Sequence, residues 1–194
     1  MSENEFWTDP SEQEFLMSYV NSETDLLEYG SGSSTLVLQD KVKKLVSVEH
    51  HEGWYNELKP KLNANVLYIY APPDNSDWEN QYSIVNNDSI RKNTAGDDGT
   101  FEDFNTYVMS PNGWGKFDIV FVDGRARAAC AWFATSLLKD ENSRIFIHDF
   151  GPETKHPHLP YRTYYDIVNN FLEEEDHVKT MYCFKAKNEN IIYS

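Results

Sequence analysis

The chain has 194 residues, of which 32 are acidic and 17 basic, and its net charge at pH 7 is −15. This excess of acids argues against general binding to phosphate backbones or to anionic membrane surfaces, so we expect no nucleic-acid partner and no membrane partner. The length and the 40% apolar content fit a single folded domain over residues 1–194.

The first ten residues are polar and acidic, and we expect an N-terminal arm over 1–10. A capping-box pattern follows, with Ser11 as N-cap and Glu14 three residues later, which predicts a helix. The start lacks the apolar segment of a signal peptide, and Cys130 and Cys183 lie in apolar surroundings typical of reduced thiols. A cytoplasmic location is therefore expected.

Apolar runs and amphipathic segments alternate along the chain and predict strands and helices in turn. The expected strands cover 25–29, 44–49, 65–70, 117–122 and 144–148, and the later helices about 35–40, 52–62, 128–139 and 161–175. The helix over 52–62 would carry Trp54, Leu58 and Leu62 on one face. Segments 178–185 and 190–193 suggest a terminal hairpin. The predicted fold class is α/β, a three-layer Rossmann-like sandwich with a mostly parallel seven-stranded sheet and a C-terminal antiparallel hairpin.

A long polar segment, 74–115, separates the third and fourth predicted strands, and only 100–109 in it has a helical pattern. It is longer than one crossover helix requires, as lids and binding loops often are. Its aromatic residues are Trp78, Tyr82, Phe101, Phe104, Tyr107 and Trp114. They could contact a sugar or another amphipathic acceptor, or they could pack on the domain; the sequence leaves both interpretations open.

The segment 26–38, LLEYGSGSSTLVL, predicts a strand, a glycine turn and a helix. Gly30 and Gly32 would let a ligand approach the backbone, and the helix N-terminus would present free N–H groups. Three further acids follow predicted strands: Glu49, Asp123 and Asp149. Because ligands of parallel α/β sheets bind at the carboxyl ends of the strands, these acids indicate a site at one edge of the sheet.

Glu28-x-Gly30-x-Gly32, followed about 20 residues later by Glu49, resembles the class I S-adenosylmethionine-dependent methyltransferases. A dinucleotide fingerprint would instead need a third glycine, where this chain has Thr35. The resemblance implies S-adenosyl-L-methionine as cofactor, with Glu49 at the ribose hydroxyls. The implied cofactor-binding residues are Glu28, Gly30, Ser31, Gly32, Ser33, Glu49, His50 and Asp123.

The stretches FVDGRARAACA and RIFIHDF resemble small bacterial and viral methyltransferases, some of which modify sugar hydroxyls, including those of rhamnose-type glycans. This implies an O-methyltransferase acting on a small or glycan acceptor. Asp149 and His148 are the candidate bases. The candidate acceptor-binding residues are Arg125, Arg162 and Trp114, although the arginines could equally form ion pairs or cap helices.

A divalent cation would help to ionise a sugar hydroxyl, and Asp123 and Asp149 could supply carboxylates to Mg²⁺. However, metal-dependent catechol-type relatives have Asp-Asn after the fifth strand and a lysine base, where this chain has Phe150 and Ala126. The sequence therefore leaves metal use open.

Two other functions stay open at this stage. One is an NAD-dependent oxidoreductase or epimerase on a Rossmann sheet, and the other is a non-catalytic, cofactor-binding methyltransferase-like subunit. The sequence also leaves the oligomeric state open, a homodimer included.

Overall fold

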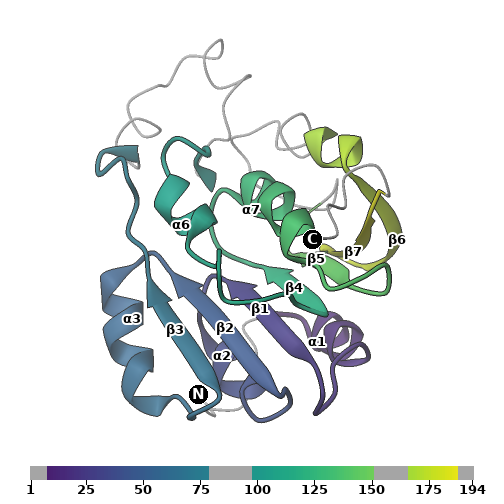
Figure 1. Ribbon diagram of the computed structural model, residues 1–194, viewed down its shortest axis with the longest axis horizontal. Coiled ribbons are helices and arrows are strands. Elements are labelled where there is room, and N and C mark those ends of the chain that lie inside the picture. Colours follow the sequence, from purple (N-terminus) through teal and green to yellow (C-terminus); the bar gives the residue numbers. More distant parts are fainter. Residues whose placement is uncertain (1–7, 79–97, 151–165, 188–194) are drawn as a thin grey trace.

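The computed structural model describes residues 8–78, 98–150 and 166–187, and the rest of the chain lies outside the description (Figure 1). The described part forms one seven-stranded sheet in the order β3-β2-β1-β4-β5-β7-β6. The strands are β1 (Asp25–Tyr29), β2 (Lys44–Glu49), β3 (Val66–Tyr70), β4 (Ile119–Val122), β5 (Arg144–Ile147), β6 (Leu172–Val178) and β7 (Met181–Ala186). β1 to β5 are parallel, and β7 runs antiparallel to both β5 and β6. The predicted Rossmann-like sheet with its terminal hairpin is confirmed.

Helices cover both faces of the sheet (Figure 1). They are α1 (Pro10–Met17), α2 (Ser33–Leu38), α3 (Glu52–Leu58), α6 (Asn105–Met109) and α7 (Arg127–Ala134), with short 3-10 helices at Lys59–Lys61, Thr135–Leu137 and Asp166–Asn170. Leu27 and Tyr29 of β1 pack in one core cluster with α6 and α7, whereas Leu26 packs with α1 and α2 in a second cluster. Because both faces are covered, the central strands are apolar almost throughout. Within the described residues, no helix is long and apolar enough to cross a membrane.

The first helix begins earlier than the sequence pattern suggested. Its N-cap is Asp9, not Ser11: the Asp9 carboxylate accepts a hydrogen bond from the Ser11 N–H at 2.9 Å. Glu12, not Glu14, completes the capping box by accepting from the Asp9 N–H at 3.3 Å. Pro10 suits the first helical position, where its missing N–H costs nothing. The expected arm over 1–10 therefore already contains the start of α1.

The prediction of a helix was wrong for residues 172–175, and the hairpin begins earlier in the chain than expected. Leu172–Val178 is a strand and not the end of a helix, and it pairs with Met181–Ala186 through a turn at Lys179, whose φ is 52°. The acidic run 173–176 lies on an exposed edge strand, where charges discourage pairing with another chain. A run of exposed acids shows neither the alternation of a half-buried strand nor the apolar stripe of a helix, so the sequence pattern did not distinguish the two. Residues 161–165 and 190–193 lie outside the described part of the chain.

The two described pieces of the 74–115 segment pack against the sheet. Trp78, Phe104 and Tyr107 are buried in the same core cluster as Tyr29. The Tyr29 hydroxyl donates to the Val108 carbonyl at 2.7 Å and so connects β1 to α6. These aromatics form part of the core, while Tyr82 lies outside the description.

Candidate functional site

A cavity of about 210 Å³ lies at the carboxyl end of the sheet. Its lining residues are Thr8, Gly30, Ser31, Gly32, Ser33, Ser34, Trp54 and Asp123. The turn between β1 and α2 supplies three of these residues and the start of α2 two, and the others come from the residue before the N-cap of α1, from α3 and from the tip of β4. The glycine turn and Asp123 therefore share one cavity, whereas Glu28, Glu49 and Asp149 are not among its lining residues.

The turn packs backbone to backbone against the loop that follows β4. Gly30 has a φ of +91°, and a Cβ on it would lie 2.6 Å from the Cα and N atoms of Gly124. Gly124 is equally constrained, because its Cβ would lie 2.1 Å from the Tyr107 hydroxyl. Gly32 differs: its φ of −179° is ordinary extended backbone, and a Cβ there would meet nothing within 4 Å. Only the first glycine of the motif is required by the fold itself.

Glu28 lies beneath the turn, fully buried. Its carboxylate accepts three hydrogen bonds, from the hydroxyls of Ser34, Thr35 and Ser47, each at 2.6 Å. Burial raises the pKa of Glu28 to about 7, and the three hydroxyls only partly oppose this effect. Such a carboxyl holds the turn and α2 in place and has no surface to offer a ligand. Thr35, which stands in place of a third glycine, therefore contributes a hydroxyl that donates a hydrogen bond to Glu28.

Glu49 ends β2 and is 2% exposed. One carboxylate oxygen accepts from the N–H and the hydroxyl of Ser31, at 2.9 and 2.6 Å, and the other accepts from the His51 N–H at 2.6 Å. The Ser31 hydroxyl also lies 2.6 Å from the Tyr68 hydroxyl. Glu49 thus binds an alcohol group directly above the turn.

His50 follows Glu49 and makes edge-on ring contacts with Phe104 and Tyr107. Burial, together with the positive charge of Arg125, lowers the pKa of His50 to about 3. The imidazole is therefore neutral at physiological pH and contributes mainly an aromatic surface beside Glu49.

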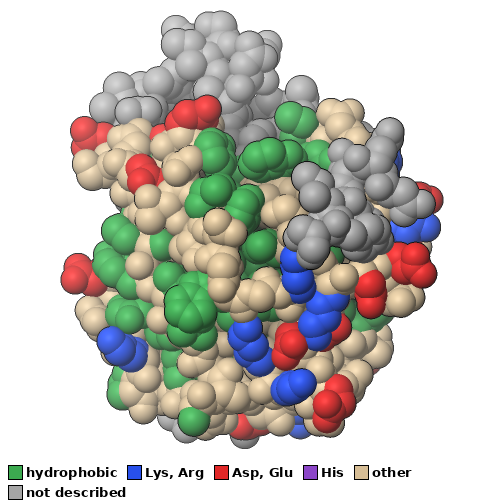
Figure 2. All heavy atoms as spheres, viewed as in Figure 1, with side chains coloured by type: hydrophobic (Ala, Val, Ile, Leu, Met, Phe, Trp, Pro, Cys, Tyr) green, Lys and Arg blue, Asp and Glu red, His purple; other side chains and the backbone are tan. Residues whose placement is uncertain are grey.

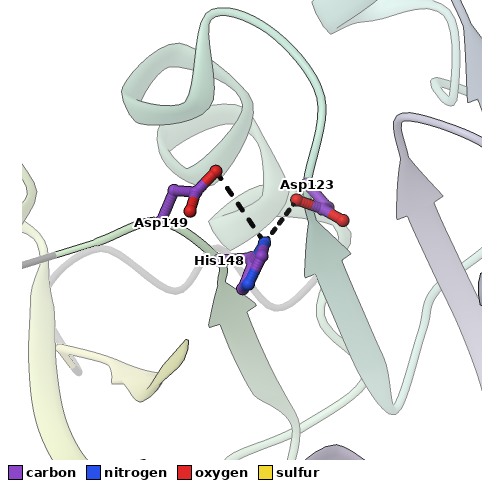
Figure 3. Close-up of side chains that lie close together, drawn as sticks. All are labelled: Asp123, His148 and Asp149. Atoms are coloured by element: carbon purple, nitrogen blue, oxygen red, sulfur yellow. Dashed lines mark hydrogen bonds and ion pairs between the residues drawn. The ribbon is translucent and has the colours of Figure 1, made fainter. Parts of the chain in front are cut away.

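Asp123, His148 and Asp149 meet at the tips of β4 and β5 (Figure 3). His148 Nδ1 lies 2.8 Å from Asp123 Oδ1 and 3.9 Å from Asp149 Oδ2. On its other side, Nε2 lies 3.0 Å from the Thr8 hydroxyl and 3.4 Å from the Glu12 carboxylate.

Burial alone would lower the pKa of His148, but the hydrogen bond and charge of Asp123, with the charges of Asp149 and Glu12, raise it to about 9. His148 is therefore an imidazolium at neutral pH. A general base must be unprotonated, so this geometry argues against His148 and leaves Asp149 as the candidate base.

Asp149 and Asp123 share a second cation, the buried guanidinium of Arg127. Arg127 Nη2 lies 3.1 Å from Asp149 Oδ2 and 4.0 Å from Asp123 Oδ1. Nη1 and the backbone N–H of the same residue bind the two oxygens of buried Asp98, each at 2.8 Å. Asp149 itself has a φ of 55°, a left-handed conformation that is unusual outside glycine and is common at functional sites.

A metal ion would meet a poor set of donors here, although one ligand atom from each of Asp123, His148 and Asp149 lies within 4.8 Å of the others. His148 carries a proton on the nitrogen that faces the acids, and Arg127 already neutralises Asp149. Because two fixed cations balance the carboxylates, we derive no step through Mg²⁺.

The structure places the other candidate residues as follows. Ser33 lines the cavity, and Arg125 lies in the loop after β4 with its Cζ 5.7 Å from the Trp78 ring centroid. Trp114 was assigned wrongly: its carbonyl accepts a hydrogen bond from Lys44, which begins β2, so it lies at the amino edge of the sheet, opposite the cavity. Arg162 lies outside the described residues.

Three residues at the site were not found from the sequence. Trp54 was expected on the buried face of its helix, but it is 43% exposed and lines the cavity, so that Leu58 alone is buried on α3. Its position just after Glu49 could have indicated a role near the ligand. Thr8 and Asp98 lie in polar segments that gave no signal, because only the tertiary fold brings them to the strand tips.

No protein-family model matches the sequence, and the search of curated proteins also gave no match. Solved structures do match the fold. A methyltransferase-like protein from Silicibacter pomeroyi superposes with a TM-score of 0.63 at 24% identity, over 95% of this chain and 89% of that one. The N-methyltransferase NodS from Bradyrhizobium japonicum gives a TM-score of 0.53 at 8% identity, over 91% and 92% of the two chains. Fibrillarin from Aeropyrum pernix, solved with natively bound S-adenosyl-L-methionine, gives 0.51 at 13% identity, over 87% and 68%.

The chain therefore has the fold of the class I S-adenosylmethionine-dependent methyltransferases. At these identities the likeness shows the fold alone. The narrower resemblance to sugar O-methyltransferases stays a prediction.

The two motif glycines should respond differently to the same substitution. Gly30→Ala should lower the free energy of unfolding by about 2 kcal/mol or more, because it combines a left-handed φ with a backbone clash. Gly32→Ala, the matched control, should cost less than about 1 kcal/mol. Urea unfolding of both variants measures the difference, and equal losses would contradict the assigned role of the Gly30–Gly124 contact.

The raised pKa of Glu28 predicts a pH-dependent stability. In the unfolded chain Glu28 titrates near its ordinary value of 4.5, and in the folded protein at about 7. The stabilisation from holding this proton is complete below pH 4.5 and is lost as the pH rises through 7, by up to about 3 kcal/mol. Glu28→Gln should remove this part of the slope. Urea unfolding from pH 5 to 8 tests it, and identical slopes for the two proteins would show that Glu28 is not the titrating group.

Proposed function

We propose that this protein is an S-adenosylmethionine-dependent methyltransferase that acts on a hydroxyl group of a small or glycan acceptor, a sugar such as rhamnose being the model acceptor. The observation that carries the proposal is the contact between Ser31 and Glu49 beside the cavity. There, a buried carboxylate already holds a hydroxyl group, in a fold shared with methyltransferases.

The Glu49 carboxylate suits the ribose of a nucleoside. A ribose hydroxyl could replace the Ser31 hydroxyl on the same oxygen, at no loss of hydrogen bonds. Trp54, exposed at the cavity, offers an aromatic face to the base. The cavity of about 210 Å³ is below the range of about 300–1,000 Å³ usual for such ligands, so binding would require the Ser31 turn to open.

When bound, the cofactor would supply a methyl group on a sulfonium centre, whose intrinsic reactivity leaves the protein mainly the task of alignment. Asp149 would accept the proton of the acceptor hydroxyl. Arg127 holds the Asp149 carboxylate in place, and protonated His148 orients Asp123 at the cavity wall. Thr8 and Glu12 support His148 from α1, so the N-terminal helix contributes to the same site.

A non-catalytic, cofactor-binding subunit is the second candidate, and one observation favours it. The carboxylate of the candidate base Asp149 is already engaged in an ion pair with Arg127 at 3.1 Å. An NAD-dependent oxidoreductase has less support, because Thr35 is committed to Glu28 where a dinucleotide fingerprint requires glycine. The proposal includes a cytoplasmic location, which fits two free, buried cysteines, Cys130 and Cys183.

Cofactor binding should depend on Glu49. Calorimetry with S-adenosylmethionine and S-adenosylhomocysteine should give micromolar dissociation constants, with no binding of NAD. Glu49→Gln should weaken both about tenfold or more, since it removes the charge from the ribose hydrogen bonds. Glu57→Gln on the exposed side of α3 is the matched control and should leave affinity unchanged. NAD binding in place of the sulfur nucleotides would reject the proposal.

Turnover should depend on Asp149. Asp149→Asn should retain the affinity for S-adenosylmethionine and lower methyl transfer about 100-fold, because the amide cannot accept the proton. Asp176→Asn, on the exposed edge strand β6, serves as control. S-adenosylhomocysteine release over a panel of sugars measures the rate. Full activity of Asp149→Asn would refute the base assignment, and cofactor binding with no turnover on any acceptor would favour the non-catalytic candidate.

A further inference from the structure

Several cations in the described part of this acidic chain have an acidic partner. Lys139 pairs with Asp25 and Asp118, and Arg144 pairs with Glu175. Figure 2 shows Lys and Arg side chains gathered on one part of the molecular face with Asp and Glu side chains beside them. A half-buried cation in a loop of the site that forms no ion pair with a described acid is a candidate to bind an anion.

Arg125 is such a cation. It lies between β4 and α7, half-buried, with its Cζ 5.7 Å from the ring centroid of buried Trp78. Its Nε is buried and has no hydrogen-bond partner in the described part of the chain. The charge of Arg125 acts on the buried carboxylate of Asp98, but both oxygens of Asp98 are bound by Arg127. Within the described residues, Arg125 therefore carries a positive charge that forms no ion pair with an acid.

The position of Arg125 relates it to the candidate site. The preceding residue, Gly124, is in backbone contact with Gly30, and Asp123 lines the cavity. Beyond the end of β2, the positive charge of Arg125 adds to the effect of burial in lowering the pKa of His50. On its other side, Arg127 begins α7 and holds Asp149. In sequence, Arg125 thus stands between residues that line or support the proposed cofactor cavity and the residue that holds the proposed base.

We propose that Arg125 binds an anionic group, a carboxylate or a phosphate, on the acceptor, so that the enzyme selects an acidic sugar over a neutral one. A guanidinium stacked on an aromatic ring is held in one plane and presents paired N–H donors that match the oxygens of a carboxylate or phosphate. Charge-assisted hydrogen bonds of this kind are about twice as strong as neutral ones. The inference rests on the proposed function for the identity of the ligand as acceptor.

Discrimination between an acidic and a neutral acceptor would be strong in this protein. The net charge of −15 repels anions at long range, so an acidic ligand binds well only where a nearby cation offsets this repulsion. A neutral sugar would leave the Arg125 guanidinium without an anionic partner in the complex with the acceptor. The two forms of the anionic group, a uronate and a phosphate, are distinguished by the probes used below.

The test follows the Arg125 Nε–H resonance by NMR in the full chain labelled with ¹⁵N-arginine, with S-adenosylhomocysteine present. D-Glucuronate or inorganic phosphate should shift this resonance with saturation at millimolar concentration, and D-glucose should leave it in place. Which of the two anions binds more tightly identifies the acidic group. No shift with either anion would overturn the proposal, and an equal shift with chloride would indicate an adventitious ion only and overturn it as well.

Variants separate this role from the alternatives. Arg125→Gln should weaken anion binding about tenfold or more and leave the affinity for S-adenosylhomocysteine unchanged. Arg125→Lys should retain part of the anion affinity, because it keeps the charge without the planar fork. Lys43→Gln, an exposed lysine just before β2, is the matched control and should change neither binding constant.

If Arg125→Gln and Arg125→Lys both lowered the affinity for S-adenosylhomocysteine, Arg125 would bind the cofactor and the proposal would be wrong. If the unmodified protein did not bind S-adenosylhomocysteine, the proposed function would fail instead. The anion titration can still be carried out on the free protein, so the two failures are distinguishable.

Discussion

The close approach of Gly30 to Gly124 is the contact on which the site depends. It lets the loops after β1 and β4 touch through their backbones, at a separation that a single methyl group would prevent. The Ser31–Glu49 pair belongs to one side of this contact, and the Asp123–His148 pair to the other. The turn after β1 and Asp123 after β4 can therefore line one cavity, because the two loops meet at Gly30 and Gly124.

The buried acids near this contact are stabilised in three different ways. Glu28 is surrounded by hydroxyl groups without a cation, so burial raises its pKa. Glu49 is bound by backbone N–H groups and a serine hydroxyl, a partner that another alcohol can replace. Asp123 and Asp149 are balanced by the charges of His148 and Arg127. The first arrangement serves the fold, and the proposed roles of ribose binding and proton transfer rest on the second and the third.

Much of the fold was predictable because it depends on local sequence. β1 and β2 were predicted with their observed bounds, since apolar runs buried on both faces give a strong signal. β6 was missed, because an exposed edge strand rich in acids lacks that signal. Trp114 was placed at the wrong edge of the sheet, because an aromatic residue in a polar segment does not reveal which end of a strand it precedes.

The sequence by itself determined the order of the first five strands, the glycine turn and the presence of acids at the strand tips. These follow from periodicity and from the steric freedom of glycine. Only the tertiary structure decided the state of each acid. Glu28 is fully buried, and acidic neighbours that include Glu12 raise the pKa of His148 and keep it protonated. Asp98 binds Arg127, which is 29 residues away in the sequence. Burial and charge pairing depend on distances between segments remote in sequence, and no local pattern contains those distances.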